Sequence, residues 1–388
     1  MTDSLAGKTL LQVIPKLKGG GAERTTLEVG AAFAAAGGRS IVVSSGGGMV
    51  DELEQHSEHI TMPVESKNPW LIAQNAKDLA EIIARDEVSI LHARSRAPAW
   101  SCLSAAKRTG VPYVTTFHGH YKAKSGLKRL YNSVMVRADR VIANSAFTGA
   151  HIRKEFAGRK YFDPSRLVTI QRGADVRVFD PSAVSEDRRR VWEARFGTGL
   201  KIALPGRFTE WKGQRGLVEA RTLLKQSHPQ IEVSALLVGR MDEKPAYVDE
   251  LRGLIRDNGV GDTAQLLPVT DDVAALLAAS DVVLSTSTEP EAFGRVAVEG
   301  MAAARPVIAS AHGGALETIK DEETGLLVAP GDAEALASAL TKLHDCGEVG
   351  RSEMGRRGMV HAQSTLSTEV MTTLVLNVYR DLLEQAGG

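Results

Sequence analysis

The sequence has few cysteines and no long apolar run. Among its 388 residues only Cys102 and Cys346 are cysteines, and they lie far apart, which favours a reducing compartment over a disulfide framework. No apolar stretch approaches the ~20 residues that a membrane span needs, and the first ten residues have Asp3 before Lys8 and no signal-peptide core. We therefore expect a cytoplasmic protein without a transmembrane anchor.

Aromatic residues are also scarce, and neither sign of charge is in excess. Aromatic side chains make up 5% of the chain, and 47 Lys and Arg balance 47 Asp and Glu. A nucleic-acid-binding module needs clustered basic and aromatic residues, so no nucleic-acid partner is expected. The chain contains no Asp-x-Asp pair and no Cys/His cluster with ligand spacing. This predicts no metal and no cofactor.

The charge is nevertheless uneven along the chain. Residues 1–185 contain 25 Lys and Arg against 17 Asp and Glu, whereas the remainder contains 22 against 30. A basic first half suits contact with an anionic surface, but scattered, solvated charge explains the same counts. Charge alone leaves both interpretations open.

The length and the pattern of apolar runs predict two α/β domains. A chain of 388 residues exceeds the usual size of one core. Short apolar runs alternate with helical stretches in both halves, which is typical of doubly wound, parallel, Rossmann-like sheets. The expected strands are residues 9–14, 40–44, 88–92, 113–117, 140–143 and 167–170, followed by 201–205, 233–238, 264–267, 282–285, 306–309 and 325–328. The predicted domains are residues 1–185 and 186–366, and residues 367–388 form a helix that crosses back toward the first domain.

Two strand ends in the first half carry candidate ligand-binding residues. Gly20 and Gly21 belong to a glycine loop between the first strand and a helix, where backbone amides favour phosphate or sugar oxygens. A tight structural turn is the alternative. His118 follows the strand 113–117 and is positioned to bond a sugar hydroxyl, although a lone histidine is more often structural.

Basic residues gather near the same strand ends. Arg94 and Arg96 follow the strand 88–92 and are expected to meet a phosphate or carboxylate of an acceptor, with solvation as the alternative. The segment 121–131 mixes leucine and tyrosine with cations, and we predict that it contacts an anionic bilayer. A solvated helix face is the competing interpretation. Its cations are Lys122, Lys124, Lys128 and Arg129.

In the second half, Arg207 and Lys212 lie between a strand and a helix. Arginine binds a diphosphate as a fork and lysine as a point charge, so the pair can neutralise a nucleotide-diphosphate leaving group without a metal.

The segment 289–301 holds Glu291 and Glu299, eight residues apart. On one continuous helix they would be separated by about 80°, so we place Glu291 in a loop and Glu299 inside the following helix. Glu291 is then expected to meet the transferred sugar and Glu299 the ribose, while the helix start at Phe293 and Gly294 faces phosphate. Ordinary surface glutamates are the alternative.

Taken together, these motifs resemble the large retaining glycosyltransferase family of GT-B fold with the E-x7-E pattern, over nearly the whole chain. That family includes bacterial mannosyl-, glucosyl- and N-acetylglucosaminyltransferases of lipopolysaccharide and glycolipid type. The resemblance rests on the glycine loop, on His118 with its neighbours, on Arg207 and Lys212, and on Glu291 with Glu299.

The resemblance implies a GT-B arrangement of two Rossmann-like domains that face each other across a cleft. It implies a hexose donor bound by Gly20, Gly21, Arg207, Lys212, Arg240, Val269, Glu291, Phe293, Gly294 and Glu299. The base is not fixed by the sequence, and we prefer UDP over GDP. His118, Glu291, Arg207 and Lys212 are the expected catalytic residues, and the configuration at the anomeric carbon is retained. The segment 121–131 and the basic first half favour a lipopolysaccharide-core or other lipid-linked acceptor at the inner face of the cytoplasmic membrane. A soluble acceptor, an epimerase and a non-catalytic nucleotide-sugar-binding protein are the alternatives.

Overall fold

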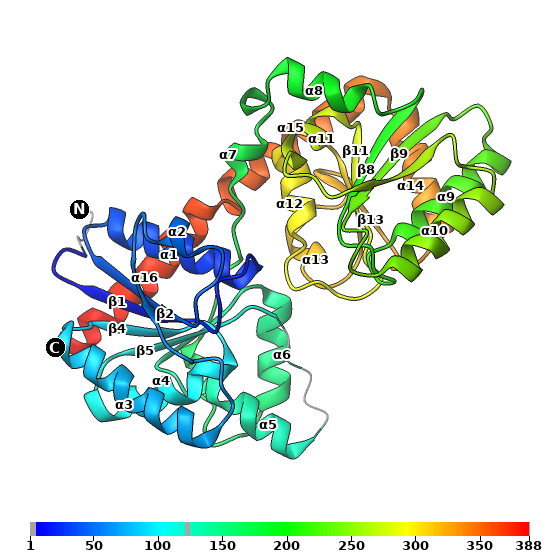
Figure 1. The fold of residues 1–388 in the computed structure, drawn as a ribbon. Coiled ribbons are helices and arrows are strands. Elements are labelled where there is room, and N and C mark those ends of the chain that lie inside the picture. The colour runs from blue at the N-terminus through cyan, green and yellow to red at the C-terminus, as the bar shows by residue number, and fades with distance from the viewer. Residues whose placement is uncertain (1–4, 120, 122–124, 388) are drawn as a thin grey trace. The chain divides into compact units, whose positions relative to one another are not determined.

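The chain folds into two compact units. The computed structural model describes residues 5–119, 121 and 125–387. The first unit comprises the residues up to Arg172 together with Glu369 onward, and the second unit is Gly173–Thr368 (Figure 1). The division therefore falls before the boundary near residue 185 that the sequence suggests, and the final helix belongs to the first unit.

A parallel sheet of seven strands forms the centre of the first unit, with the order β3-β2-β1-β4-β5-β6-β7. Six of the strands lie on the predicted apolar runs. The edge strand β3 was not predicted, because its residues are only partly buried and its sequence, Glu-His-Ile-Thr, forms no apolar run. The strands are β1 (Thr9–Val13), β2 (Arg39–Ser44), β3 (Glu58–Thr61), β4 (Ile90–Ala93), β5 (Tyr113–Phe117), β6 (Arg140–Ala143) and β7 (Leu167–Thr169).

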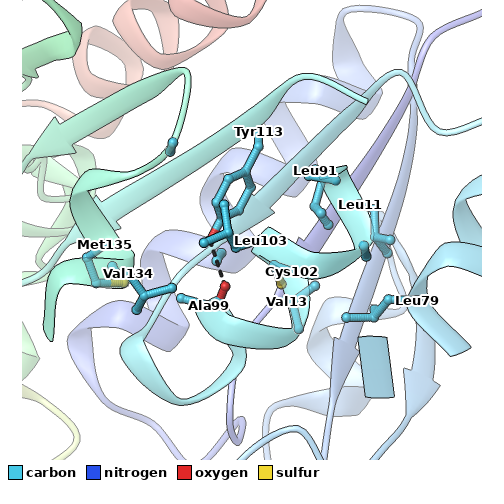
Figure 2. Packing of buried hydrophobic residues seen from close by; sticks show 14 of the residues in the cluster. Leu11, Val13, Leu79, Leu91, Ala99, Cys102, Leu103, Tyr113, Val134 and Met135 are labelled. Carbon is cyan, nitrogen blue, oxygen red and sulfur yellow. Dashed lines mark hydrogen bonds between the residues drawn. The ribbon is translucent and has the colours of Figure 1, made fainter. Parts of the chain in front are cut away.

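Helices connect these strands in the crossover pattern that parallel pairing requires. They are α1 (Gly21–Ala35), α2 (Val50–Leu53), α3 (Pro69–Arg85), α4 (Arg96–Thr109), α5 (Gly126–Asn132) and α6 (Ala146–Phe156). Figure 2 shows how α4 packs, with Cys102 and Leu103 against apolar side chains of the strands. The buried hydroxyl of Tyr113 donates a hydrogen bond to the carbonyl of Ala99, 3.1 Å away.

The second unit repeats the architecture with six parallel strands in the order β10-β9-β8-β11-β12-β13. All six lie on predicted runs. They are β8 (Leu200–Pro205), β9 (Val233–Gly239), β10 (Ala264–Pro268), β11 (Val282–Ser285), β12 (Val307–Ser310) and β13 (Gly325–Val328). The helices are α7 (Val176–Phe179), α8 (Glu186–Glu193), α9 (Gln214–Ser227), α10 (Pro245–Asp257), α11 (Val273–Ala279), α12 (Arg295–Ala302), α13 (Ala315–Thr318), α14 (Ala333–Asp345) and α15 (Gly347–Thr365).

The last helix, α16 (Thr368–Gly387), completes the core of the first unit. Its apolar side chains, including Met371, Val375 and Tyr379, form one buried cluster with Leu10 and Val114 of the central strands. Neither α16 nor any other helix in the described residues is long and apolar enough to cross a bilayer.

Both connections of the second unit to the rest of the chain lie together. Ala174 pairs with Ser367 in a parallel bridge, in which Ala174 N donates to the Leu366 carbonyl and Thr368 N donates to the Ala174 carbonyl, each at 2.9 Å. A Cβ at Gly173 would collide with the backbone of Ser367, so the close pairing requires a glycine there.

Candidate functional site

The candidate residues of the second unit collect at the carboxyl edge of its sheet. Strand β8 lies between β9 and β11, so the loops after these three strands begin at one edge, where open α/β sheets bind ligands. Arg207 follows β8, Arg240 follows β9, and the loop containing Glu291 follows β11. The structure thus brings three separate sequence motifs to one edge.

Lys212 and Glu291 form an ion pair at this edge. Lys212 Nζ lies 2.8 Å from Glu291 Oε2, and the two side chains are 15% and 25% exposed. The same ammonium lies 4.5 Å from the centre of the Trp211 ring. The other Glu291 oxygen accepts a hydrogen bond from Ser287. Both charges are therefore held in place yet open to solvent on one side.

Two further residues fix the loop that carries Glu291, and neither was predicted to contact it. His312 Nε2 lies 2.8 Å from the carbonyl oxygen of Ser287, and the amide of Gly314 donates to the carbonyl of Glu291 over 2.8 Å. Gly313 has φ +59°, and a Cβ there would collide with the Glu291 carbonyl. The Gly-Gly pair after β12 was the available signal for this contact.

Helix α12 begins beside this loop. Gly294 is its N-cap, with φ +79°, and no side chain caps the first turn. The backbone amides at the start of the helix are consequently available for an anion. Phe293 is buried in the core of the unit, so its side chain anchors the loop.

Glu299 lies inside α12, as predicted from the spacing to Glu291. Its side chain is buried, and Oε1 lies 2.8 Å from Arg295 Nε, one turn earlier. The carboxylate therefore already has a charged partner. Arg240 and Val269 are both exposed, and Arg240 lies 3.7 Å from Glu243.

In the first unit, the glycine loop before α1 lies against an arginine. A Cβ at Gly21 would collide with the guanidinium of Arg172, and a Cβ at Gly20 would collide with the carboxylate of Glu23. Only glycine fits at these two positions without displacing a charged side chain. Arg172, which follows β7, was not identified from the sequence.

His118 follows β5 in a cationic and apolar environment. Burial, reinforced by the charges of Arg94 and Arg172, lowers its pKa well below the ordinary value. The imidazole is therefore neutral at neutral pH. Its Nε2 is buried with no hydrogen-bond partner among the described residues. A neutral ring with an unused nitrogen can accept or donate a hydrogen bond to a ligand.

Arg94, which was expected to meet an acceptor group or to be solvated, has a buried side chain. It is 1% exposed, and its guanidinium donates to the Thr25 carbonyl at 2.6 Å and to the Thr26 hydroxyl at 3.2 Å. Burial lowers its pKa to about 10. Solvation, the alternative considered for Arg94, is therefore wrong, because the side chain turns inward and ties β4 to α1. Its contact with a phosphate or carboxylate of an acceptor stays a prediction.

A buried polar chain adjoins His118 and was missed by the sequence analysis. His92 Nδ1 lies 2.6 Å from the Tyr379 hydroxyl, and His92 Nε2 lies 2.8 Å from the Thr116 hydroxyl. Burial, with the charges of Arg94 and His118, lowers the pKa of His92 well below its ordinary value. The chain joins two strand ends to α16.

Arg96 and Lys128 line a surface hollow of about 480 Å³ together with Lys67 and Tyr131. The Arg96 guanidinium stacks 3.8 Å from the centre of the Tyr121 ring and donates to Asn132. Arg129 is instead paired with Glu155 at 2.6 Å. Lys122 and Lys124 lie outside the described residues. In the described part of the chain, no three His, Cys, Asp or Glu side chains converge as metal ligands.

Two family models match the chain. The model described as glycosyl transferases group 1 covers residues 187–358, and the model described as glycosyltransferase family 4 covers residues 19–178. A crystal structure of a glycosyltransferase from Rickettsia africae ESF-5 has a TM-score of 0.88 and 35% identity, covering 97% of this chain and 98% of that chain.

Two further comparisons name a bound nucleotide and an activity. The structure of Anabaena Alr3699/HepE in complex with UDP has a TM-score of 0.80 and 24% identity, covering 96% of this chain and 100% of that one. A protein of Pseudarthrobacter chlorophenolicus named D-inositol 3-phosphate glycosyltransferase is 29% identical over 314 residues, which are 76% of this chain and 72% of that relative.

Proposed function

Because the chain belongs to the glycosyltransferase group 1 family and has the GT-B fold, we propose that it transfers a hexose from a nucleotide-diphosphate sugar to an acceptor. The observation that carries the proposal is the Lys212–Glu291 pair at the carboxyl edge of the second sheet. It joins a cation suited to a diphosphate and a carboxylate suited to sugar hydroxyls.

The donor site of the proposal lies in the second unit. Lys212 and Arg207 bind the diphosphate, and Glu299 accepts hydrogen bonds from the ribose. The backbone amides of Phe293 and Gly294, directly before α12, contact phosphate or sugar. Glu291 binds sugar hydroxyls. The exposed Arg240 and Val269 flank the base. UDP is the preferred nucleotide, which the complex of Anabaena HepE with UDP supports.

We further propose that transfer retains the configuration at the anomeric carbon and needs no metal. As the bond from the anomeric carbon to phosphate breaks, the bond to the acceptor oxygen forms on the same face, and the acceptor proton passes to the departing phosphate. Arg207 and Lys212 would stabilise the charge that develops there. His118, which is neutral, would contribute a hydrogen bond to the sugar and no proton. Gly20 and Gly21 would permit close approach of the donor.

The acceptor in this proposal carries an anionic group. The hollow lined by Lys67, Arg96 and Lys128 joins three cations and fits a phosphate better than a neutral sugar. A lipopolysaccharide-core or other lipid-linked acceptor is our first choice. A soluble phosphorylated polyol is the alternative acceptor, and the relative named D-inositol 3-phosphate glycosyltransferase favours it.

For a lipid-linked acceptor we propose peripheral binding to the inner face of the cytoplasmic membrane through α5. Leu127 and Leu130 of this helix are 82% and 50% exposed, and Lys128 lies between them. Apolar and cationic side chains together suit an anionic bilayer. Sedimentation with phosphatidylglycerol vesicles should decrease steeply between 0.05 and 0.5 M salt, on the order of tenfold. Binding that ignores salt contradicts this part of the proposal.

Calorimetry with UDP, GDP, ADP and their hexose conjugates, in EDTA, tests the donor site. One nucleotide should bind clearly, and Glu299→Ala should weaken it about tenfold or more, as the loss of a charged hydrogen-bond acceptor predicts. Hydrolysis or transfer of the bound conjugate separates an enzyme from a non-catalytic binding protein. Failure of every nucleotide to bind contradicts the proposed function.

A further inference from the structure

A second cavity of the second unit lies beside the candidate donor site and shares none of its charged residues. It has a volume of about 90 Å³ and opens between the first turns of α9 and α14, above the ends of β11, β12 and β13. Neither Arg207, Lys212, Glu291 nor Glu299 lines it. One water needs about 10–15 Å³ on this measure, so the space exceeds that of a single structural water.

Two buried hydroxyls in this cavity have no hydrogen-bond partner in the described part of the chain. Thr286 and Ser310 are 6% and 2% exposed and both line the cavity. Neither hydroxyl oxygen has a hydrogen-bond partner among the described residues. Because a buried hydroxyl without a partner is unfavourable, each is suited to bond a molecule in the cavity.

The charges at the rim restrict the class of that molecule. Glu210, Glu219 and Asp332 line the cavity, against a single cation, Arg215. Arg215 is already paired with Glu250, and it lies 3.8 Å from Glu219. An anion is therefore disfavoured, while carboxylates and hydroxyls both accept hydrogen bonds from a polyol.

The remaining wall is aliphatic. Val328 and Leu336 are buried and line the cavity. Such a surface suits the C–H face of a sugar or polyol. We propose that this cavity binds a small, neutral, polyhydroxylated molecule, a monosaccharide or a linear polyol, at a site separate from that of the nucleotide.

A ligand in this cavity would contact the loop that leads to Glu291. Thr286 and Thr288 both line the cavity, and the amide of Thr288 donates to the carbonyl of Trp211 at 2.7 Å, next to Lys212. Occupancy would add contacts to this loop beyond its hydrogen bond to Trp211. The binding site itself does not depend on the proposed transferase function.

Saturation-transfer NMR on the full chain with D-glucose, D-mannose and D-mannitol tests the proposal. At least one probe should receive saturation, and an excess of UDP should not abolish it. Gly216 lines the cavity, and a Cβ there meets no atom within 4 Å. Gly216→Met should therefore fill the space and weaken binding at least tenfold. Gly253→Met, at a helix glycine with similar free space in α10, is the matched control and should bind like the wild type.

If Gly216→Met does not fold, the double variant Thr286→Val with Ser310→Ala provides the second test, since it removes both hydroxyls and nearly preserves volume. It should also weaken binding at least tenfold. No saturation of any probe, an unchanged signal in the folded Gly216→Met or in the double variant, or displacement by UDP would overturn the proposal.

Discussion

Lys212 Nζ lies 2.8 Å from Glu291 Oε2, so a residue before α9 and a residue before α12 neutralise each other at the carboxyl edge of one sheet. In the proposed donor complex this pair would have to share its charges with the diphosphate and the sugar. Replacing either residue would therefore remove a contact with the ligand and also leave the charge of the other residue unpaired.

Replacing Lys212 by methionine should reduce the affinity for UDP about 10- to 100-fold, because it removes a charge-assisted contact and leaves Glu291 to repel the phosphates. Lys244→Met is the matched control, since Lys244 also pairs with a glutamate, Glu210, but on the exposed surface. Calorimetry measures both. Equal affinities in the two variants would contradict the assignment of Lys212 to the diphosphate.

Two glycines with similar positive φ angles should differ in their tolerance of alanine. Gly213 has φ +85° and Gly294 has φ +79°, but a Cβ at Gly213 would collide with the Thr286 carbonyl, whereas a Cβ at Gly294 meets nothing within 4 Å. Gly294→Ala should cost about 1–2 kcal/mol of backbone strain. Gly213→Ala should cost about 1–3 kcal/mol more, from overpacking. Urea denaturation of the second unit checks the difference, and similar midpoints would show that the loop relaxes.

Acidification should destabilise the first unit before its carboxylates titrate. His92 and His118 have pKa values well below the ordinary one when folded, so the unfolded chain binds more protons below its pKa of about 6.5. The free energy of unfolding therefore falls as the pH drops through 6.5, by up to about 1.4 kcal/mol per pH unit for each histidine. The lowered pKa values of Glu58 and Asp86 matter only at lower pH.

Pulse proteolysis in urea at pH 7.0 and 5.5, with peptides of the first unit as the readout, measures this slope. His118→Gln should lower the number of protons taken up on unfolding by about one, and the pH slope of the free energy of unfolding should fall accordingly. A slope that is unchanged in this variant would mean that His118 is already solvated and titrates normally.

Tyr379→Phe should destabilise the first unit by about 1–3 kcal/mol, because it leaves His92 Nδ1 buried without its 2.6 Å partner. Tyr247→Phe is the matched control. The hydroxyl of Tyr247 is also buried but has no partner among the described residues, so its loss should be neutral or slightly stabilising. The same proteolysis assay, read for each unit, compares them, and equal effects would contradict a structural role for the His92 contact.

The apolar runs predicted most strands of the fold, because buried parallel strands are apolar on both faces. β3 escaped detection for the opposite reason: its pattern of Glu58 and Thr61 around one apolar residue belongs to an edge, where one side meets solvent. The start of α12 between Glu291 and Glu299 was predicted from their eight-residue spacing. On one continuous helix the two carboxylates would point about 80° apart, so only Glu299 was placed in the helix.

Interactions between distant residues were beyond the sequence. The contact between His92 and Tyr379 joins residues 287 apart, and no local pattern announces it. Arg94 was expected to meet an acceptor group or solvent because it follows a predicted strand end. Its amide instead continues the sheet by donating to the Val13 carbonyl at 2.9 Å, which turns the side chain toward α1.

The bridge between Ala174 and Ser367 means that the second unit has the connectivity of an insertion. Its first and last residues are neighbours, so residues 173–368 form a module. If this module were removed, one short linker could join the two ends of the chain that remain. The first unit is the host of this insertion. Its core is complete only when α16, with Tyr379, has been synthesised after the second unit. On the ribosome the second unit can therefore fold first, whereas the first unit can complete its core only after α16 has been synthesised.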